Sequence, residues 1–83
     1  MVKQQISEAK LIDVINNELV SRWSHKTHTC RVERLRKASF PERNWEIDIM
    51  SNGGPDLNHI GACDELRNAV LEELSSKYEV QWP

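Results

Sequence analysis

The hydrophobic residues near the start of the chain recur at helical spacing. From Leu11 to Trp23 they fall every three or four positions, and polar residues occupy most of the positions between them. Ser7 precedes this pattern and has the side chain of a typical helix N-cap. The spacing therefore predicts a first helix over residues 8–22.

The next patterned segment predicts a strand that begins near Thr27. Val32 points to its apolar face, but Leu35 is out of phase with that face. A single β-bulge near Glu33 or Arg34 would return Leu35 to the apolar side. We therefore expect an irregular strand.

The clearest strand pattern begins at Trp45. Trp45, Ile47 and Ile49 alternate with acidic residues, as in a sheet with one buried and one solvated face. Residues 37–43 contain Pro41, which cannot donate to a strand ladder, so this segment is expected to be the loop of a β-hairpin.

The last third of the chain predicts a helix and a short strand. After a Gly- and Pro-rich turn, apolar residues return at helical spacing over residues 59–76: Ile60, Cys63, Leu66, Val70 and Leu74. In residues 78–82 the period changes to two, which predicts a third strand. We expect one α+β domain over residues 1–83, with two layers: two helices packed on one face of a small antiparallel sheet whose other face is open and polar.

Composition limits the size of the core. The chain has 83 residues, of which 39% are hydrophobic and 29% charged, and a chain of this length buries only about 60% of its unfolded surface. No segment approaches the run of about 18 apolar residues that would span a membrane. Two cysteines without disulfide-dense spacing fit a reducing compartment, so a cytoplasmic location is predicted.

Charge is distributed unevenly along the chain. Residues 22–43 carry a net charge of +5, residues 44–83 carry −6 and residues 1–21 carry −1. In a hairpin, Arg31 or Arg34 could pair across the strands with Glu46 or Asp48. The sequence leaves open whether these charges neutralise one another within one chain or across two chains.

The basic segment supplies the candidate binding residues. Arginine and lysine side chains bind phosphate, and Trp23 or Phe40 could add a stacking surface for bases. The candidate residues for phosphate or partner binding are Arg31, Arg34, Arg36, Lys37 and Arg43.

A second cluster contains soft metal ligands and a possible nucleophile. His59 and Cys63 are four residues apart on one helix face, where they could bind zinc, or His59 could activate the Cys63 thiol. Both cysteines also lie on apolar faces, where a free cysteine behaves as a small hydrophobic residue. We therefore predict no metal site, cofactor or catalytic residue, and leave open whether five residues converge: His25, His28, Cys30, His59 and Cys63.

These patterns predict a non-catalytic interaction module that self-associates or docks on a protein partner. A small sheet with an open face could accept a second copy, so a homodimer is a reasonable hypothesis. Nucleic-acid binding through residues 22–43 and a small zinc-binding domain using His59 and Cys63 are the alternatives. No membrane partner and no small-molecule substrate is inferred.

Overall fold

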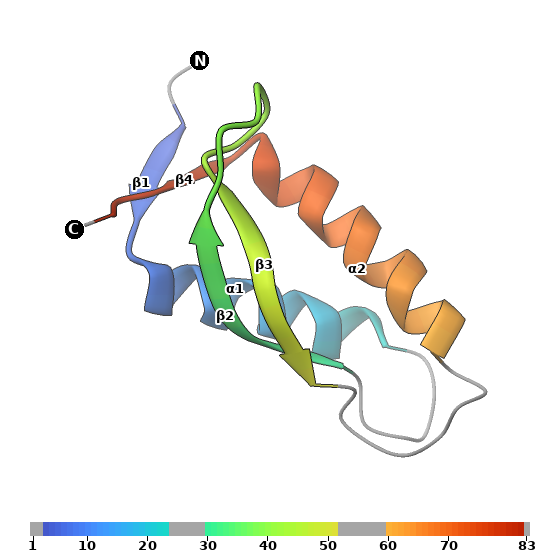
Figure 1. Cartoon of the computed structure of the whole chain (residues 1–83). Coiled ribbons are helices and arrows are strands. Elements are labelled where there is room, and N and C mark those ends of the chain that lie inside the picture. Colours follow the sequence, from blue (N-terminus) through green and yellow to red (C-terminus); the bar gives the residue numbers. More distant parts are fainter. Residues whose placement is uncertain (1–2, 24–29, 52–59, 83) are drawn as a thin grey trace.

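A computed structural model describes residues 3–23, 30–51 and 60–82. It confirms the α+β class (Figure 1). Along the chain the elements are β1 (Gln4–Ile6), α1 (Glu8–Arg22), β2 (Arg31–Lys37), β3 (Trp45–Ser51), α2 (Ile60–Ser75) and β4 (Tyr78–Val80). Neither helix in the described part of the chain is long and apolar enough to cross a membrane.

Both helices lie where the sequence predicted them. The Ser7 hydroxyl accepts a hydrogen bond from the Lys10 N–H at 3.3 Å, which satisfies one of the unpaired donors of the first turn of α1. Leu11, Ile15 and Leu19 are fully buried, so the predicted apolar stripe is confirmed. Helix α2 agrees with its predicted range to within one residue at each end.

The strands form two separate pairs, which differs from the single antiparallel sheet expected. β2 and β3 form the predicted antiparallel hairpin, but β4 pairs in parallel with β1. The β1–β4 pair is fixed by hydrogen bonds from the Gln4 N–H to the Lys77 carbonyl at 3.0 Å and from the Gln81 N–H to the Ile6 carbonyl at 2.8 Å. β1 was not predicted, because three residues with one apolar side chain give no recognisable strand pattern.

The hairpin register contains two compensating irregularities. It skips Glu33 in β2 and Asp48 in β3. The first confirms the predicted bulge, and Val32 and Leu35 are both buried as that bulge requires. The second was not predicted, and it turns Ile49 outward, where it is 42% exposed. The prediction that Ile49 faces the core is therefore wrong.

Two asparagine side chains connect separate elements through paired hydrogen bonds. Asn16 of α1 donates to the Val32 carbonyl at 3.0 Å and accepts from the Val32 N–H at 2.8 Å. Asn44, just before β3, makes the same pair of bonds with Val80 of β4, both at 2.9 Å. Asn44 thereby links the two strand pairs, and fully buried Trp45 adds a bond from its indole N–H to the Tyr78 carbonyl at 3.2 Å.

Cys30 and Cys63 form a disulfide, with Cα atoms 6.3 Å apart. The expectation that they are free thiols is wrong. The prediction that both side chains face the core is confirmed, since Cys30 is 4% and Cys63 8% exposed. The two are bonded because Cys30, just before β2, lies next to the first turns of α2. Cysteine usage consequently no longer supports a reducing compartment, and the cytoplasmic location stays a prediction.

Candidate functional site: the open face of the hairpin

Four of the five predicted basic residues are exposed on β2. In the hairpin register Arg31 lies opposite Ser51, Arg34 opposite Ile49, and Arg36 opposite Glu46, with Lys37 at the strand end. Across the described ranges, no acidic side chain lies within 4.0 Å of these four cations. The predicted pairing of Arg31 or Arg34 with Glu46 or Asp48 is therefore wrong for this structure.

Arg43, the fifth predicted residue, points into the fold instead. Its guanidinium donates to the Trp45 carbonyl at 2.8 Å, to the Glu46 carboxylate at 2.8 Å and to the Ser75 hydroxyl at 3.5 Å. It also stacks over the rings of Phe40, at 4.8 Å, and Trp45, at 5.5 Å. The side chain is only 18% exposed. Arg43 thus connects the hairpin loop to α2, whereas the basic side chains of β2 are exposed to solvent.

The Arg43 network also explains why Arg36 has no acidic partner. Glu46 is the cross-strand neighbour of Arg36, but one of its carboxylate oxygens binds Arg43 and the other accepts the Ile47 N–H at 3.0 Å. These two bonds draw the carboxylate to the outer edge of β3. The charge of Arg36 is left without a partner on the face of the hairpin.

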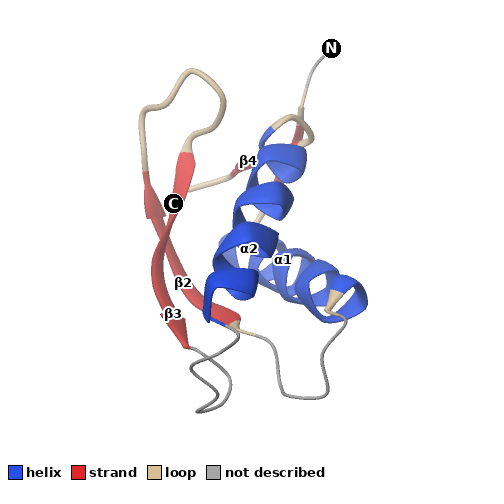
Figure 2. Cartoon of the chain, turned by 90° about the vertical axis from the view of Figure 1, so that its right-hand side faces the viewer, coloured by secondary structure: helices blue, strands red, loops and turns tan. Residues whose placement is uncertain are grey.

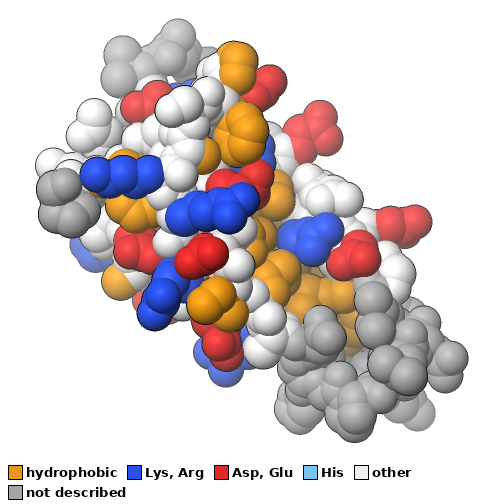
Figure 3. Space-filling model, viewed as in Figure 1, with side chains coloured by type: hydrophobic (Ala, Val, Ile, Leu, Met, Phe, Trp, Pro, Cys, Tyr) orange, Lys and Arg blue, Asp and Glu red, His pale blue; other side chains and the backbone are white. Residues whose placement is uncertain are grey.

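Two exposed acidic residues lie near these arginines in the hairpin. Glu33 and Asp48, which the register skips, are both exposed, and within the described residues neither forms an ion pair. Figure 3 shows basic and acidic side chains interspersed on the viewed side of the molecule, with hydrophobic side chains between them. We name the open face by six residues of the hairpin: Arg31, Glu33, Arg34, Arg36 and Ile49, together with Asp48 at its β3 edge, where Asp48 also lines the hollow beside α2.

The edges of the hairpin are capped by side chains. On β2, Asn16 occupies both backbone groups of Val32, and the Glu8 carboxylate accepts the Leu35 N–H at 3.1 Å. On β3, the Trp45 carbonyl and the Ile47 N–H are bound by Arg43 and Glu46. Backbone groups that already have partners disfavour the addition of another strand. A partner is therefore more readily accepted on the face than along these edges.

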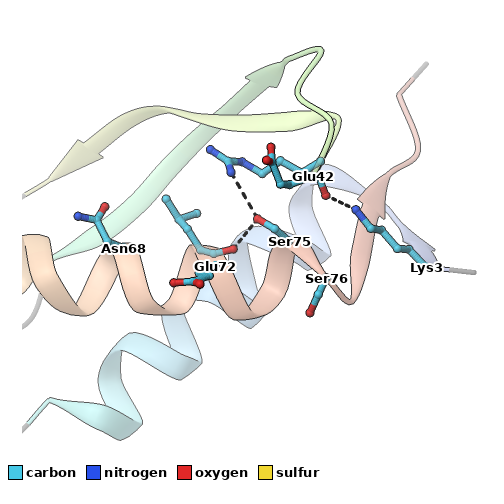
Figure 4. Close-up of a pocket in the computed structure, with 8 residues that line it drawn as sticks. Lys3, Glu42, Asn68, Glu72, Ser75 and Ser76 are labelled. Atoms are coloured by element: carbon cyan, nitrogen blue, oxygen red, sulfur yellow. Dashed lines mark hydrogen bonds between the residues drawn. The ribbon is translucent and has the colours of Figure 1, made fainter. Parts of the chain in front are cut away.

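A groove of about 500 Å³ separates α2 from the hairpin loop (Figure 4). An adjoining hollow of about 460 Å³ shares Arg43, Asn68 and Leu71 with it. The polar groups of the groove are largely engaged with one another: Arg43 donates to Ser75, Ser75 to the Leu71 carbonyl, and Lys3 to the Glu42 carbonyl. The residues that line it include neither histidine nor cysteine.

The predicted metal ligands are only partly within the described chain. His25, His28 and His59 lie outside it, and the disulfide leaves neither cysteine with the free thiolate that zinc binds. Residues 3–23, 30–51 and 60–82 contain no group of three histidine, cysteine, aspartate or glutamate residues that could hold a metal ion.

Elsewhere, ion pairs join or brace the helices. Arg22 at the end of α1 hydrogen-bonds the Glu73 carboxylate of α2, which lowers the pKa of Glu73 and raises that of Arg22. Within α2, the Arg67 guanidinium lies 3.4 Å from the Asp64 carboxylate. The pair between Arg22 and Glu73 joins α1 to α2, whereas the pair between Asp64 and Arg67 lies within α2, where Arg67 lines the same hollow as Asp48.

Sequence reasoning located the basic residues but missed the arrangement that defines the open face. Arg31, Arg34 and Arg36 share that face because the register skips Glu33, and Ile49 joins them because it skips Asp48. The first register shift, at Glu33, could be predicted because Leu35 is out of phase with the apolar face of the strand. No feature of the sequence marked the second shift, at Asp48. Comparison of the chain with models of protein families, with curated proteins and with solved structures gives no match, so the candidate site rests on the residues described above.

Proposed function

We propose that this chain is a non-catalytic interaction module that binds a second copy of itself through the open face of the hairpin. One observation supports this proposal. The open face has five charged side chains of both signs without ion-pair partners in the described part of the chain, and the exposed Ile49 lies opposite one of them, Arg34, in the hairpin register. Charges that do not neutralise one another within a chain are available to do so across two chains.

A mixed-sign face is compatible with two-fold symmetry. In a symmetric dimer the same patch contacts itself, so residue i of one copy meets residue j of the other and the reverse. A face with only arginines would repel its copy, whereas one with Arg34 and Asp48 can place each opposite the other. Ile49 supplies an apolar contact between these charges.

The position of the helices leaves this face accessible. Figure 2 shows the hairpin on one side of α1 and α2. In this proposal the two helices form one layer that covers the inner face of the hairpin. Because the edges of β2 and β3 are capped, two copies would meet face to face rather than by strand addition. This arrangement differs from β-augmentation, in which strand edges pair.

The size of the face predicts weak association. Seven-residue strands extend about 24 Å at 3.4 Å per residue, and a two-stranded ribbon offers much less than the roughly 800 Å² per partner of a standard stable interface. The dimer is therefore expected to form at micromolar or higher protein concentration and to dissociate as salt screens the charged contacts.

Sedimentation velocity over a concentration series tests the proposal. The native chain should shift towards dimer with concentration, and Ile49→Asp should remain monomeric because it buries an extra charge at the contact. Val20→Asp is the matched control, since Val20 is 61% exposed on α1, away from the hairpin. A native chain that stays monomeric at high concentration, or equal losses in the two variants, would refute the proposal.

Nucleic-acid binding remains the second candidate because Arg31, Arg34, Arg36 and Lys37 have no acidic partner in the described structure. It is less favoured, since residues 30–51 contain five basic and four acidic residues and have little net positive charge. Fluorescence anisotropy with labelled DNA and RNA decides between the two. Salt-sensitive binding that is lost in Arg34→Ala but kept in Lys10→Ala would favour nucleic acid.

A further inference from the structure

Helix α2 is attached to the rest of the fold mainly through its C-terminal half. Val70, Leu74 and Ser75 are buried there. The same half is joined to α1 by the ion pair between Arg22 and Glu73. The Ser75 hydroxyl also accepts a hydrogen bond from Arg43 of the hairpin loop.

The N-terminal half of α2 has much less holding it. Among residues 61–66 only Cys63 is buried, while Ala62 and Leu66 are partly exposed and the other three are exposed. Apolar burial is the main source of helix stability in proteins of this size, and an isolated two-turn segment is not stable in water. Within residues 61–66, Leu66 packs against the core while partly exposed, and the one buried side chain is Cys63, which is bonded to Cys30.

We propose that the Cys30–Cys63 disulfide is a redox latch that holds the N-terminal half of α2 against the start of β2. A low-potential dithiol opens it by exchange: one donor thiolate attacks a protein sulfur, the protein S–S bond breaks, and the second donor thiolate displaces the mixed disulfide. The protein gains two thiols, and the donor is oxidised to its own disulfide. Glutathione disulfide reverses the reaction, taking two electrons and yielding two glutathione thiols.

Opening the latch is local because the remaining contacts of α2 do not depend on it. In the reduced protein the first turns of α2 lose their covalent link to the hairpin, but Val70 and Leu74 stay in the core. The hollow between β3 and α2, which Met50 and Arg67 help to line, widens at this end. The groove near Ser75 keeps its shape, since Arg43 still bridges it.

Hydrogen exchange measured by mass spectrometry on the full chain tests the latch. The readout is the ratio of amide protection between residues 70–75 and residues 61–66, in the oxidised protein and after reduction with dithiothreitol. Where both halves exchange through global unfolding, a loss of global stability lowers their protection by the same factor and leaves the ratio unchanged, so a rise in the ratio reports local opening of residues 61–66. We expect the ratio to rise at least tenfold on reduction and to return after treatment with glutathione disulfide.

Two variants make the result decisive. The double variant Cys30→Ala/Cys63→Ala should show the high ratio without reductant and should not respond to dithiothreitol. Ser76→Ala is the control, since Ser76 is exposed beyond the end of α2, and it should respond as the native chain does. An unchanged ratio on reduction, with both halves losing protection together or neither losing it, would overturn the latch.

Discussion

Replacing Asn44 with alanine removes both side-chain hydrogen bonds to Val80 and leaves the bond from the Trp45 indole to the Tyr78 carbonyl as the side-chain link between β3 and β4. Val80 is 3% exposed, so water cannot readily replace the lost partners of its N–H and C=O groups. A buried backbone group left unsatisfied costs about 1–3 kcal/mol, and two such groups give a loss near 3 kcal/mol. An 83-residue domain has a total stability of only about 4–12 kcal/mol.

The loss converts into a measurable shift in melting temperature. With an unfolding entropy of about 2.1 cal/mol/K per residue, 3 kcal/mol corresponds to a Tm lowered by about 15–20 °C. Differential scanning calorimetry of Asn44→Ala measures it directly. The control is Asn68→Ala, because Asn68 is exposed on α2 and its side chain forms no hydrogen bond within the described residues. A Tm drop in Asn44→Ala no larger than that of the control would refute the assigned role.

Two further predictions concern charged side chains. The lowered pKa of Glu73 beside Arg22 means that this carboxylate stabilises the fold above its unfolded pKa and that the contribution is lost as the pH falls through the folded pKa. The free energy of unfolding, measured with urea from neutral to acidic pH, should therefore fall less steeply towards acid in Glu73→Gln than in the native chain. Identical pH profiles of the two proteins would contradict this. Arg43→Lys keeps the charge but cannot reproduce three directed guanidinium bonds, so it should lose about 1–2 kcal/mol. An unchanged urea midpoint would show that Arg43 is not a structural link.

Local patterns predicted the helices and the first strand irregularity well. The Ser7 cap and the buried stripe of α1 are encoded within a few residues, and the phase of Leu35 marked the bulge near Glu33. The second irregularity could not be found this way. Trp45, Ile47 and Ile49 alternate regularly, and the shift at Asp48 arises only when β3 must match the shifted β2.

Features that depend on distant contacts were not predictable. β1 becomes a strand because β4 lies beside it, and Gln4 to Ile6 contain too little pattern to show this alone. Cys30 and Cys63 are 33 residues apart, so their bond requires the relative position of β2 and α2. The basic residues were identified from composition, but their separation into an inward Arg43 and an exposed set depends on the loop geometry.

The central claim is that the open face binds its own copy, and a charge exchange between Arg34 and Asp48 tests it most directly. Arg34→Asp and Asp48→Arg should each dimerise less than the native chain in sedimentation equilibrium, because each puts charges of the same sign at positions 34 and 48, which the proposal places opposite each other across the two copies. Mixed in equal amounts, they should form a heterodimer that neither forms alone, since the two carboxylates at positions 34 and 48 of one copy then meet the two guanidinium groups at these positions of the other. If the mixture sediments as two independent monomers while the native chain dimerises, the open face is not the contact.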